Sequence, residues 1–383
     1  YKVLASYYIT NQKIIFDGAK LLKSLSSSFY VENPDYLKVA EQYFKRLTYL
    51  DRLNTNYYIS LAELYYALND GDMAQKTLFR ALEYQKSNSA MYESIANVFY
   101  DFYDYDNALK VLYNYRERTN KPSSFRPLVG RLYELKSMYP EAIKEFIADI
   151  LENYENYDSQ KRLKSVYFKN KNLQKTIVDS IVAKYDEIIK NETAFYNFIS
   201  LFSLIDNKEN AEKLYNYAST NSKELAILQS CFSYYLKKEK LDVAEKILLN
   251  IEKQFNTDDS IDSLISFYQQ NKNFDKASIY FEKLLQRHPL ENDKYSFQYA
   301  LDRYTAYLMQ EKKYGKIVSI NENIAKTISE NDEYEYIYFN LKLASYYKLN
   351  NQLKEQEALL LSLKNKYKTD NSIIQAMFEY YRE

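Results

Sequence analysis

The residues of this 383-residue chain that could carry out chemistry are few and isolated from one another. His288 is the single histidine and Cys231 the single cysteine. One histidine without a cysteine in phase makes neither a zinc site nor a nucleophile–base pair. His288 precedes Pro289 at a predicted helix end, where the helix dipole favours a histidine. Cys231 cannot form an intrachain disulfide, and we interpret it as a small buried apolar residue.

Other signals of chemistry are weak as well. The four glycines are isolated, so no glycine-rich loop is available to hold a phosphate. Neighbouring acidic residues such as Asp258 and Asp259 are typical of solvated helix starts. We therefore expect no catalytic residue, no metal ligand, no cofactor and no enzymatic activity.

The composition bounds the class of protein. Lys and Arg total 52 and are matched by 52 Asp and Glu, so no basic excess favours binding to nucleic acid. No apolar run approaches the roughly 18 residues of a membrane span. Only 4 Gly and 5 Pro interrupt the chain, which predicts an almost entirely helical structure.

The helices are organised by an internal repeat with an interval of 34 residues. An alanine recurs at this interval, at Ala40, Ala74, Ala108 and Ala142. The residues three before each alanine are Leu37, Gly71, Tyr105 and Tyr139, and the residues four after it are Phe44, Leu78, Leu112 and Phe146. An aromatic residue lies nine before the later three, at Tyr65, Phe99 and Tyr133. A fixed period of this length indicates stacked units of the same supersecondary structure.

Each period predicts two helices joined by a short polar break. In the second helix of one period, Gly71, Ala74 and Leu78 lie on a single face. The alanine must be small because the first helix crosses closely at that point. One pair leaves its outer face apolar, and the next pair has to cover it, so arrays are stable where single units are not.

This pattern resembles the tetratricopeptide repeat family. The matching residues are Tyr58, Leu61, Ala62, Tyr65, Ala74 and Ala81, then Tyr92, Ile95, Ala96, Phe99, Tyr105 and Ala108, then Val129, Gly130, Tyr133, Tyr139, Ala142 and Phe146. The chain departs from the family in having no Trp and in placing Leu78 and Leu112 where Phe is usual. The resemblance implies an all-α fold, an α–α superhelix that forms a right-handed solenoid of about ten helix pairs.

The phase continues beyond the regular part, with the small position at Thr176, Ala211, Ala244, Ala277, Ile317 and Gln356. We predict one solenoid over 1–383 with five sections: N-terminal helices and a first repeat in 1–54, regular repeats in 55–151, a degenerate repeat in 152–192, regular repeats in 193–289, and longer, looser repeats with a C-terminal cap in 290–383. An apolar stripe of Ile14, Ile15, Ala19, Leu22 and Leu25 should pair with the helix at Ala40.

Three sections carry further expectations. In 152–192, Ser180 occupies the position of the family's Phe, which predicts a softer stack. In 372–381 the cap should be made by Ile373, Ile374, Met377 and Tyr380. The acidic insertions at 290–293 and 329–333 are either longer loops or an acidic rim that selects a basic partner.

The chain has 44 tyrosines, which need an explanation. Tyr is a core residue of the family's first helix, and a chain rich in Lys, Asn, Ile and Tyr also fits an AT-rich genome. The alternative is that the excess lines a groove, since Tyr is enriched at interfaces. The resemblance places the concave wall on the first helices, and the candidate partner-binding residues there are Tyr66, Glu93, Asn97, Tyr100, Arg131, Phe168, Tyr196 and Leu236.

We expect a scaffold that binds a protein partner of unknown identity in its groove or along its edge. The Lys–Asn pair with which some family members clamp a terminal carboxylate is missing, because the corresponding pairs are Ile59 with Glu63, Glu93 with Asn97, and Lys161 with Ser165. The resemblance, together with a composition typical of an AT-rich genome, leads us to expect a bacterial setting. We expect an envelope assembly such as a secretion or flagellar apparatus, in the periplasm or at a membrane. Self-assembly into homo-oligomers, and a groove that binds polysaccharide or nucleic acid by aromatic stacking, remain open.

Overall fold

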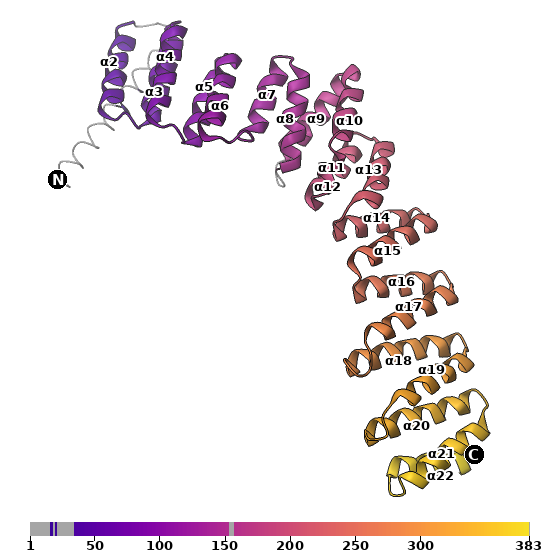
Figure 1. Cartoon of the computed structure of the whole chain (residues 1–383). Coiled ribbons are helices and arrows are strands. Elements are labelled where there is room, and N and C mark those ends of the chain that lie inside the picture. Colours follow the sequence, from indigo (N-terminus) through magenta and orange to yellow (C-terminus); the bar gives the residue numbers. More distant parts are fainter. Residues whose placement is uncertain (1–15, 18–19, 21–33, 153–156, 383) are drawn as a thin grey trace, which may run out of the picture. The chain divides into compact units, whose positions relative to one another are not determined.

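The structure is a computed structural model that describes Phe16, Asp17, Lys20 and residues 34–152 and 157–382. Every regular element in these described residues is a helix, as the sequence predicts (Figure 1). The predicted N-terminal stripe of Ile14, Ile15, Ala19, Leu22 and Leu25 lies outside the described residues.

The chain divides into two compact units, the first ending at Lys237 and the second beginning at Lys238. The boundary falls inside the section 193–289 that the sequence predicts as one run of repeats. The helices of the first unit are α2 (Pro34–Leu50), α3 (Thr55–Ala67), α4 (Gly71–Tyr84), α5 (Ser89–Asp101), α6 (Tyr105–Thr119), α7 (Arg126–Leu135), α8 (Tyr139–Glu152), α9 (Tyr157–Lys169), the 3-10 helix η1 (Lys171–Leu173), α10 (Gln174–Val182), α11 (Tyr185–Ile188), α12 (Glu192–Leu204), α13 (Lys208–Asn221) and α14 (Leu225–Lys237). Those of the second are α15 (Leu241–Phe255), α16 (Asp258–Gln270), α17 (Phe274–Arg287), α18 (Lys294–Gln310), α19 (Tyr314–Thr327), α20 (Glu333–Leu349), α21 (Leu353–Lys366) and α22 (Asn371–Arg382).

Within each unit the helices pack as consecutive pairs of a first and a second helix (Figure 1). The first helices of unit 1 are α3, α5, α7, α9, α12 and α14, and those of unit 2 are α16, α18, α20 and α22. In unit 1, α3 contacts α5, α7 contacts α9, and α12 contacts both α9 and α14. The first helices of a unit therefore share one side of it, which we call the first-helix face.

A recurring backbone turn ends the first helices at the same point of the repeat. A residue with positive φ follows the helix end, at Asn69, Tyr103, Ser137 and Asp206 in unit 1 and at Glu239, Lys272, Lys312 and Asn351 in unit 2. At seven of these positions the amide after it bonds back to the carbonyl five residues earlier, as in Asp70 N–H to Tyr65 O at 2.8 Å. This is a Schellman turn, which suits glycine best and costs other residues about 1–2 kcal/mol.

The interface between paired helices depends on small residues, as predicted. Ala40, Ala74, Ala108 and Ala142 are fully buried. On the first-helix side, a Cβ added to Gly130 of α7 would lie 2.5 Å from Cε1 of the buried Phe146 in α8. The helices therefore approach so closely there that only glycine fits.

The degenerate repeat differs from its predicted phase. The 3-10 helix η1 replaces the Schellman turn, and the second helix is divided into α10 and the short α11. Thr176, predicted at the small buried position, is exposed, while Ile177 and Ile181 are buried. The register has slipped by one residue because isoleucines at this four-residue spacing bury more apolar surface than Thr176 and Ser180 would. The softer stack remains a prediction.

The C-terminal cap is smaller than predicted. Ile373 is fully buried on α22, but Ile374 is exposed and Met377 and Tyr380 are half-buried. Consecutive residues of a helix point about 100° apart, so Ile374 cannot share the buried side of Ile373.

The glycine contact gives a paired test. Gly130→Ala should lower the free energy of unfolding by about 1–3 kcal/mol, since the methyl group meets the ring of Phe146. Gly71→Ala, where a Cβ meets nothing within 4 Å, should be neutral or stabilising by up to about 1 kcal/mol. Urea denaturation followed by circular dichroism measures both. Equal effects of the two substitutions would contradict the close approach.

The Schellman turns give a second test with the opposite sign. Lys272→Gly should raise the free energy of unfolding by about 0.5–1 kcal/mol. Glycine removes the strain of the left-handed backbone, and this gain exceeds the extra conformational entropy that glycine gives the unfolded chain. The control, Lys246→Gly in the exposed middle of α15, should lower it by about 1 kcal/mol. Thermal denaturation distinguishes the two, and a lowered midpoint for Lys272→Gly would contradict the strain.

Candidate binding surface

The eight predicted partner-binding residues all lie on first helices of unit 1. Their helices are α3 for Tyr66, α5 for Glu93, Asn97 and Tyr100, α7 for Arg131, α9 for Phe168, α12 for Tyr196 and α14 for Leu236. Four are exposed, namely Glu93, Asn97, Phe168 and Tyr196. The other four, Tyr66, Tyr100, Arg131 and Leu236, are half-buried, so the predicted set divides into accessible and packed members.

Tyr66 belongs to the packed group. Its ring stacks on Phe102 from the next repeat, with centroids 4.0 Å apart and planes 13° apart. Burial raises the pKa of Tyr66 to about 12, and its buried hydroxyl has no hydrogen-bond partner among the described residues. Tyr66 thus joins two repeats and offers a partner little area.

Tyr100 and Arg131 are brought together from α5 and α7. The Arg131 guanidinium lies 4.5 Å from the centroid of the Tyr100 ring and also donates a hydrogen bond to its hydroxyl. A cation held over an aromatic face in this way stabilises the contact between the helices. The pair links two first helices and places a fixed, half-buried positive group on the first-helix face.

Phe168 and Tyr196 are the accessible aromatic residues of the set. Their side chains are 53% and 43% exposed, and they lie on α9 and α12, which contact each other. Each has an edge contact with the residue before it, Tyr167 at 5.5 Å and Phe195 at 5.8 Å between centroids. Large apolar area remains uncovered there.

Unit 2 carries a second group of exposed tyrosines that the sequence analysis did not single out. Tyr295 and Tyr299 of α18, and Tyr334 and Tyr338 of α20, are exposed. A signal for them exists in the sequence, because each pair has a spacing of four residues, is followed four residues later by a cation, and recurs after 39 residues. The family resemblance is strongest in the regular repeats, whereas these tyrosine pairs lie in the looser repeats of 290–383.

The cations that follow these tyrosines bridge neighbouring first helices. Arg303 of α18 lies 2.8 Å from an Asp262 oxygen of α16, and Lys342 of α20 lies 2.7 Å from an Asp302 oxygen of α18. The same cations lie over tyrosine rings, Arg303 at 5.3 Å from Tyr299 and Lys342 at 5.0 Å from Tyr338. The space between successive first helices is filled here by repeated Asp–cation bridges.

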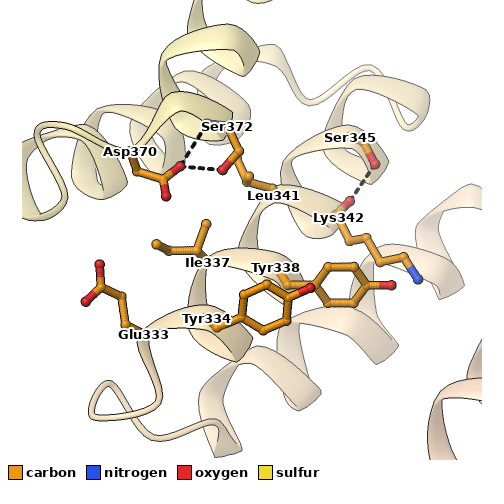
Figure 2. Close-up of a pocket in the computed structure, with 9 residues that line it drawn as sticks. All are labelled: Glu333, Tyr334, Ile337, Tyr338, Leu341, Lys342, Ser345, Asp370 and Ser372. Carbon is orange, nitrogen blue, oxygen red and sulfur yellow. Dashed lines mark hydrogen bonds between the residues drawn. The ribbon is translucent and has the colours of Figure 1, made fainter. Parts of the chain in front are cut away.

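A cavity of about 700 Å³ opens beside α20 at the start of α22 (Figure 2). Its lining residues are Glu333, Tyr334, Ile337, Tyr338, Leu341, Lys342, Ser345, Asp370 and Ser372. Figure 2 shows Glu333 and Asp370 at one end, Lys342 and Ser345 at the other, and Ile337 and Leu341 between them. The Ser372 hydroxyl and two backbone amides of α22 donate to Asp370, which holds the pKa of that carboxyl below its usual range.

Many other tyrosines are structural, which supports the core explanation of their number. The Tyr268 hydroxyl donates to Glu245 of the preceding second helix at 2.7 Å, and Lys276 of the following one pairs with the same carboxylate. Tyr304, Glu282 and Lys316 repeat this arrangement. Two hydrogen bonds lower the pKa of Glu245: the larger effect comes from the Lys276 ammonium and the smaller from the Tyr268 hydroxyl.

The isolated residues with chemical potential also have structural surroundings. Cys231 is fully buried, and burial raises the pKa of its thiol to about 12. His288 caps the end of α17, with Nε2 2.7 Å from an Asp258 oxygen. The described part of the chain contains no group of three or more His, Cys, Asp or Glu arranged to hold a metal ion. None of the described helices combines the length and the hydropathy that crossing a membrane requires.

No protein-family model matches the chain, and no curated protein matches it. Among solved structures, that of Naa15/Naa10 bound to HypK-THB aligns with 97% of this chain, at 11% identity and a TM-score of 0.29, and this chain covers 66% of its length. A tetratricopeptide repeat protein from Parabacteroides merdae aligns with 74% of this chain and 99% of its own, at 15% identity and a TM-score of 0.24. The C-terminal part of a repeat-containing protein of the same kind from Cytophaga hutchinsonii aligns with 71% and 94%, at 16% identity and a TM-score of 0.29.

At these TM-scores the likenesses carry no argument about function. The tetratricopeptide-like character rests on the chain itself: consecutive helix pairs, with fully buried alanines at the predicted positions 40, 74, 108, 142, 244 and 277. The fold class implied by the resemblance is thereby confirmed, while its handedness stays a prediction.

The tyrosine–glutamate–lysine arrangement makes a pH-dependent prediction. A carboxyl whose pKa is lowered on folding stabilises the fold above its ordinary pKa of 4.5, and this contribution is lost as the pH falls through the folded value. Glu245→Gln should therefore cost about 0.5–1.5 kcal/mol at pH 7 and less below about pH 4. Urea denaturation at both pH values measures this, with Glu291→Gln in an exposed loop as the control. A cost that is unchanged at low pH would exclude an ionic contribution.

Proposed function

We propose that this chain is a non-catalytic protein-binding scaffold whose partners contact the first-helix face. The observation that carries the proposal is the pair of exposed aromatic side chains, Phe168 and Tyr196, on the contacting helices α9 and α12. Aromatic residues with large accessible area are the commonest anchors of protein interfaces, because they bury much surface at low entropy cost.

The surroundings of these anchors favour a protein partner over nucleic acid. Exposed Glu93 and Asn97 and the fixed cation Arg131 give the same face polar groups of mixed kind. A protein interface combines apolar anchors with such a polar rim, whereas nucleic acid selects a basic stripe. The formal net charge of zero agrees with a protein partner.

Self-association is a second candidate, and α22 supports it. Ile374, Phe378 and Tyr381 are exposed on this helix at intervals of four and three residues, so they form one apolar stripe. A second copy covering the stripe would make the molecular mass depend on concentration in analytical ultracentrifugation. A constant monomer mass up to about 100 µM would exclude association of ordinary affinity.

Polysaccharide binding is a further candidate. The exposed rings of Tyr334 and Tyr338 lie nearly parallel, with planes 9° apart and centroids 6.5 Å apart, which is a suitable platform for stacking. Binding of soluble glycans that is lost in Tyr334→Ala would favour it over a protein partner.

For the setting, we propose a bacterial envelope assembly such as a secretion or flagellar apparatus, in the periplasm or at a membrane. The support is the composition rich in Lys, Asn, Ile and Tyr, together with the scaffold character. Cell fractionation that recovers the chain with cytosolic markers would contradict this setting.

Affinity capture from native lysate tests the main proposal. Wild type is compared with Phe168→Ala/Tyr196→Ala, because both side chains are exposed and their truncation spares the core. The matched control is Tyr43→Ala/Tyr49→Ala, two exposed tyrosines on the second helix α2. We expect a small set of proteins to be lost from the first variant alone. The same proteins on all three columns would reject the first-helix face of unit 1 as the binding surface.

A further inference from the structure

Two cavities adjoin along α20 and form a groove between it and α22. The first is the cavity of about 700 Å³ in Figure 2, and the second measures about 680 Å³. Leu341 and Ser345 line both, so the cavities meet on one side of α20. Each has the size of a ligand-binding site. We call the combined feature the α20–α22 groove.

The groove opens where the repeated Asp–cation bridge stops. Asp262 and Asp302 hold this place on α16 and α18, and each pairs with a cation of the next first helix. The same place on α20 is taken by Leu341, 39 residues after Asp302, and leucine cannot form the bridge. The helix α22 buries Ile373, and its Tyr381 hydroxyl donates to Glu357 of α21 at 3.1 Å. The opening therefore follows from a substitution within the repeat.

The lining of the groove has an apolar centre and an acidic excess. Ile337 and Leu341 lie between the two ends shown in Figure 2, with Tyr334, 75% exposed, beside them. The carboxylates that line the two cavities are Glu333, Asp370, Glu357 and Glu379, and the cations are Lys342 and Lys348. Lys342 is already paired with Asp302, so the lining favours a positively charged ligand.

We infer that the α20–α22 groove binds a linear segment of a partner protein in which basic residues alternate with leucine-like apolar residues. The apolar side chains contact Ile337 and Leu341. The basic ones approach Glu333 and Asp370 in the first cavity and Glu357 and Glu379 in the second. From Glu333 to Lys348 the helix rises about 22 Å, which an extended segment of about seven residues spans. The inference rests on the proposed protein-binding function and specifies the chemistry of one partner.

Fluorescence anisotropy with three labelled heptapeptides tests the inference on the full chain. One peptide alternates Lys with Leu, one Glu with Leu, and one Lys with Ser. The Lys/Leu peptide should bind at least about tenfold more tightly than either of the others, since only it matches both the charge and the apolar centre. Equal binding of the Glu/Leu or the Lys/Ser peptide would overturn the proposed chemistry.

Variants locate the binding. Glu333→Gln and Glu333→Lys should weaken the Lys/Leu peptide by about threefold and tenfold respectively. Glu291→Lys, the same charge change in an exposed loop that does not line the groove, should change it less than about twofold. Unchanged circular dichroism confirms folding of each variant. If Glu333→Lys and Glu291→Lys weakened binding equally, the peptide would be held by general charge attraction, and binding in the groove would be refuted.

This outcome is separable from the proposed function. Capture that depends on Phe168 and Tyr196 reports on unit 1, so it can succeed while the peptide experiment fails. Binding of a soluble glycan in place of the Lys/Leu peptide, lost in Tyr334→Ala, would also overturn the inference.

Discussion

The close approach of the two helices within each repeat is the constraint on which the rest of the structure depends. In the regular repeats it requires a small residue where the helices cross, which Ala40, Ala74 and Ala108 supply from the second helix. In the α7–α8 pair, a methyl group at position 130 would meet the ring of Phe146, and Gly130 takes the position. With the pair set at this distance, the outer face of each pair is apolar and the next pair covers it, so the array extends by repetition.

Stacking of successive pairs uses the same side chains that could otherwise bind a partner. Tyr66 stacks on Phe102, Tyr100 lies under Arg131, and Tyr268 donates to Glu245. A tyrosine satisfies this role well because its ring packs while its hydroxyl finds a polar partner. Only a tyrosine or phenylalanine that the next repeat leaves uncovered remains available to bind, as Phe168 and Tyr196 do.

We therefore expect binding surfaces where the repetition is incomplete. Between α16, α18 and α20, Asp–cation bridges join successive first helices. At α20 and α22 a leucine replaces the aspartate and a groove appears. The degenerate repeat around α10 shows the same relation, since a cavity of about 650 Å³ lies beside α8 where the second helix is divided.

The sequence by itself determined the features that depend on near neighbours along the chain. The interval from Ala40 to Ala142 predicted the helix pairs, the buried small positions and the all-α fold, because helix periodicity is a relation between residues three and four apart. It also placed all eight candidate residues on first helices. Only the tertiary structure decided which of them are accessible. Tyr66 and Phe168 share one position of the repeat, yet Tyr66 is stacked on Phe102 whereas Phe168 is 53% exposed. The register slip from Thr176 to Ile177 and the groove at Leu341 were decided in the same way, since burial is set by side chains that arrive from the next repeat, more than thirty residues away.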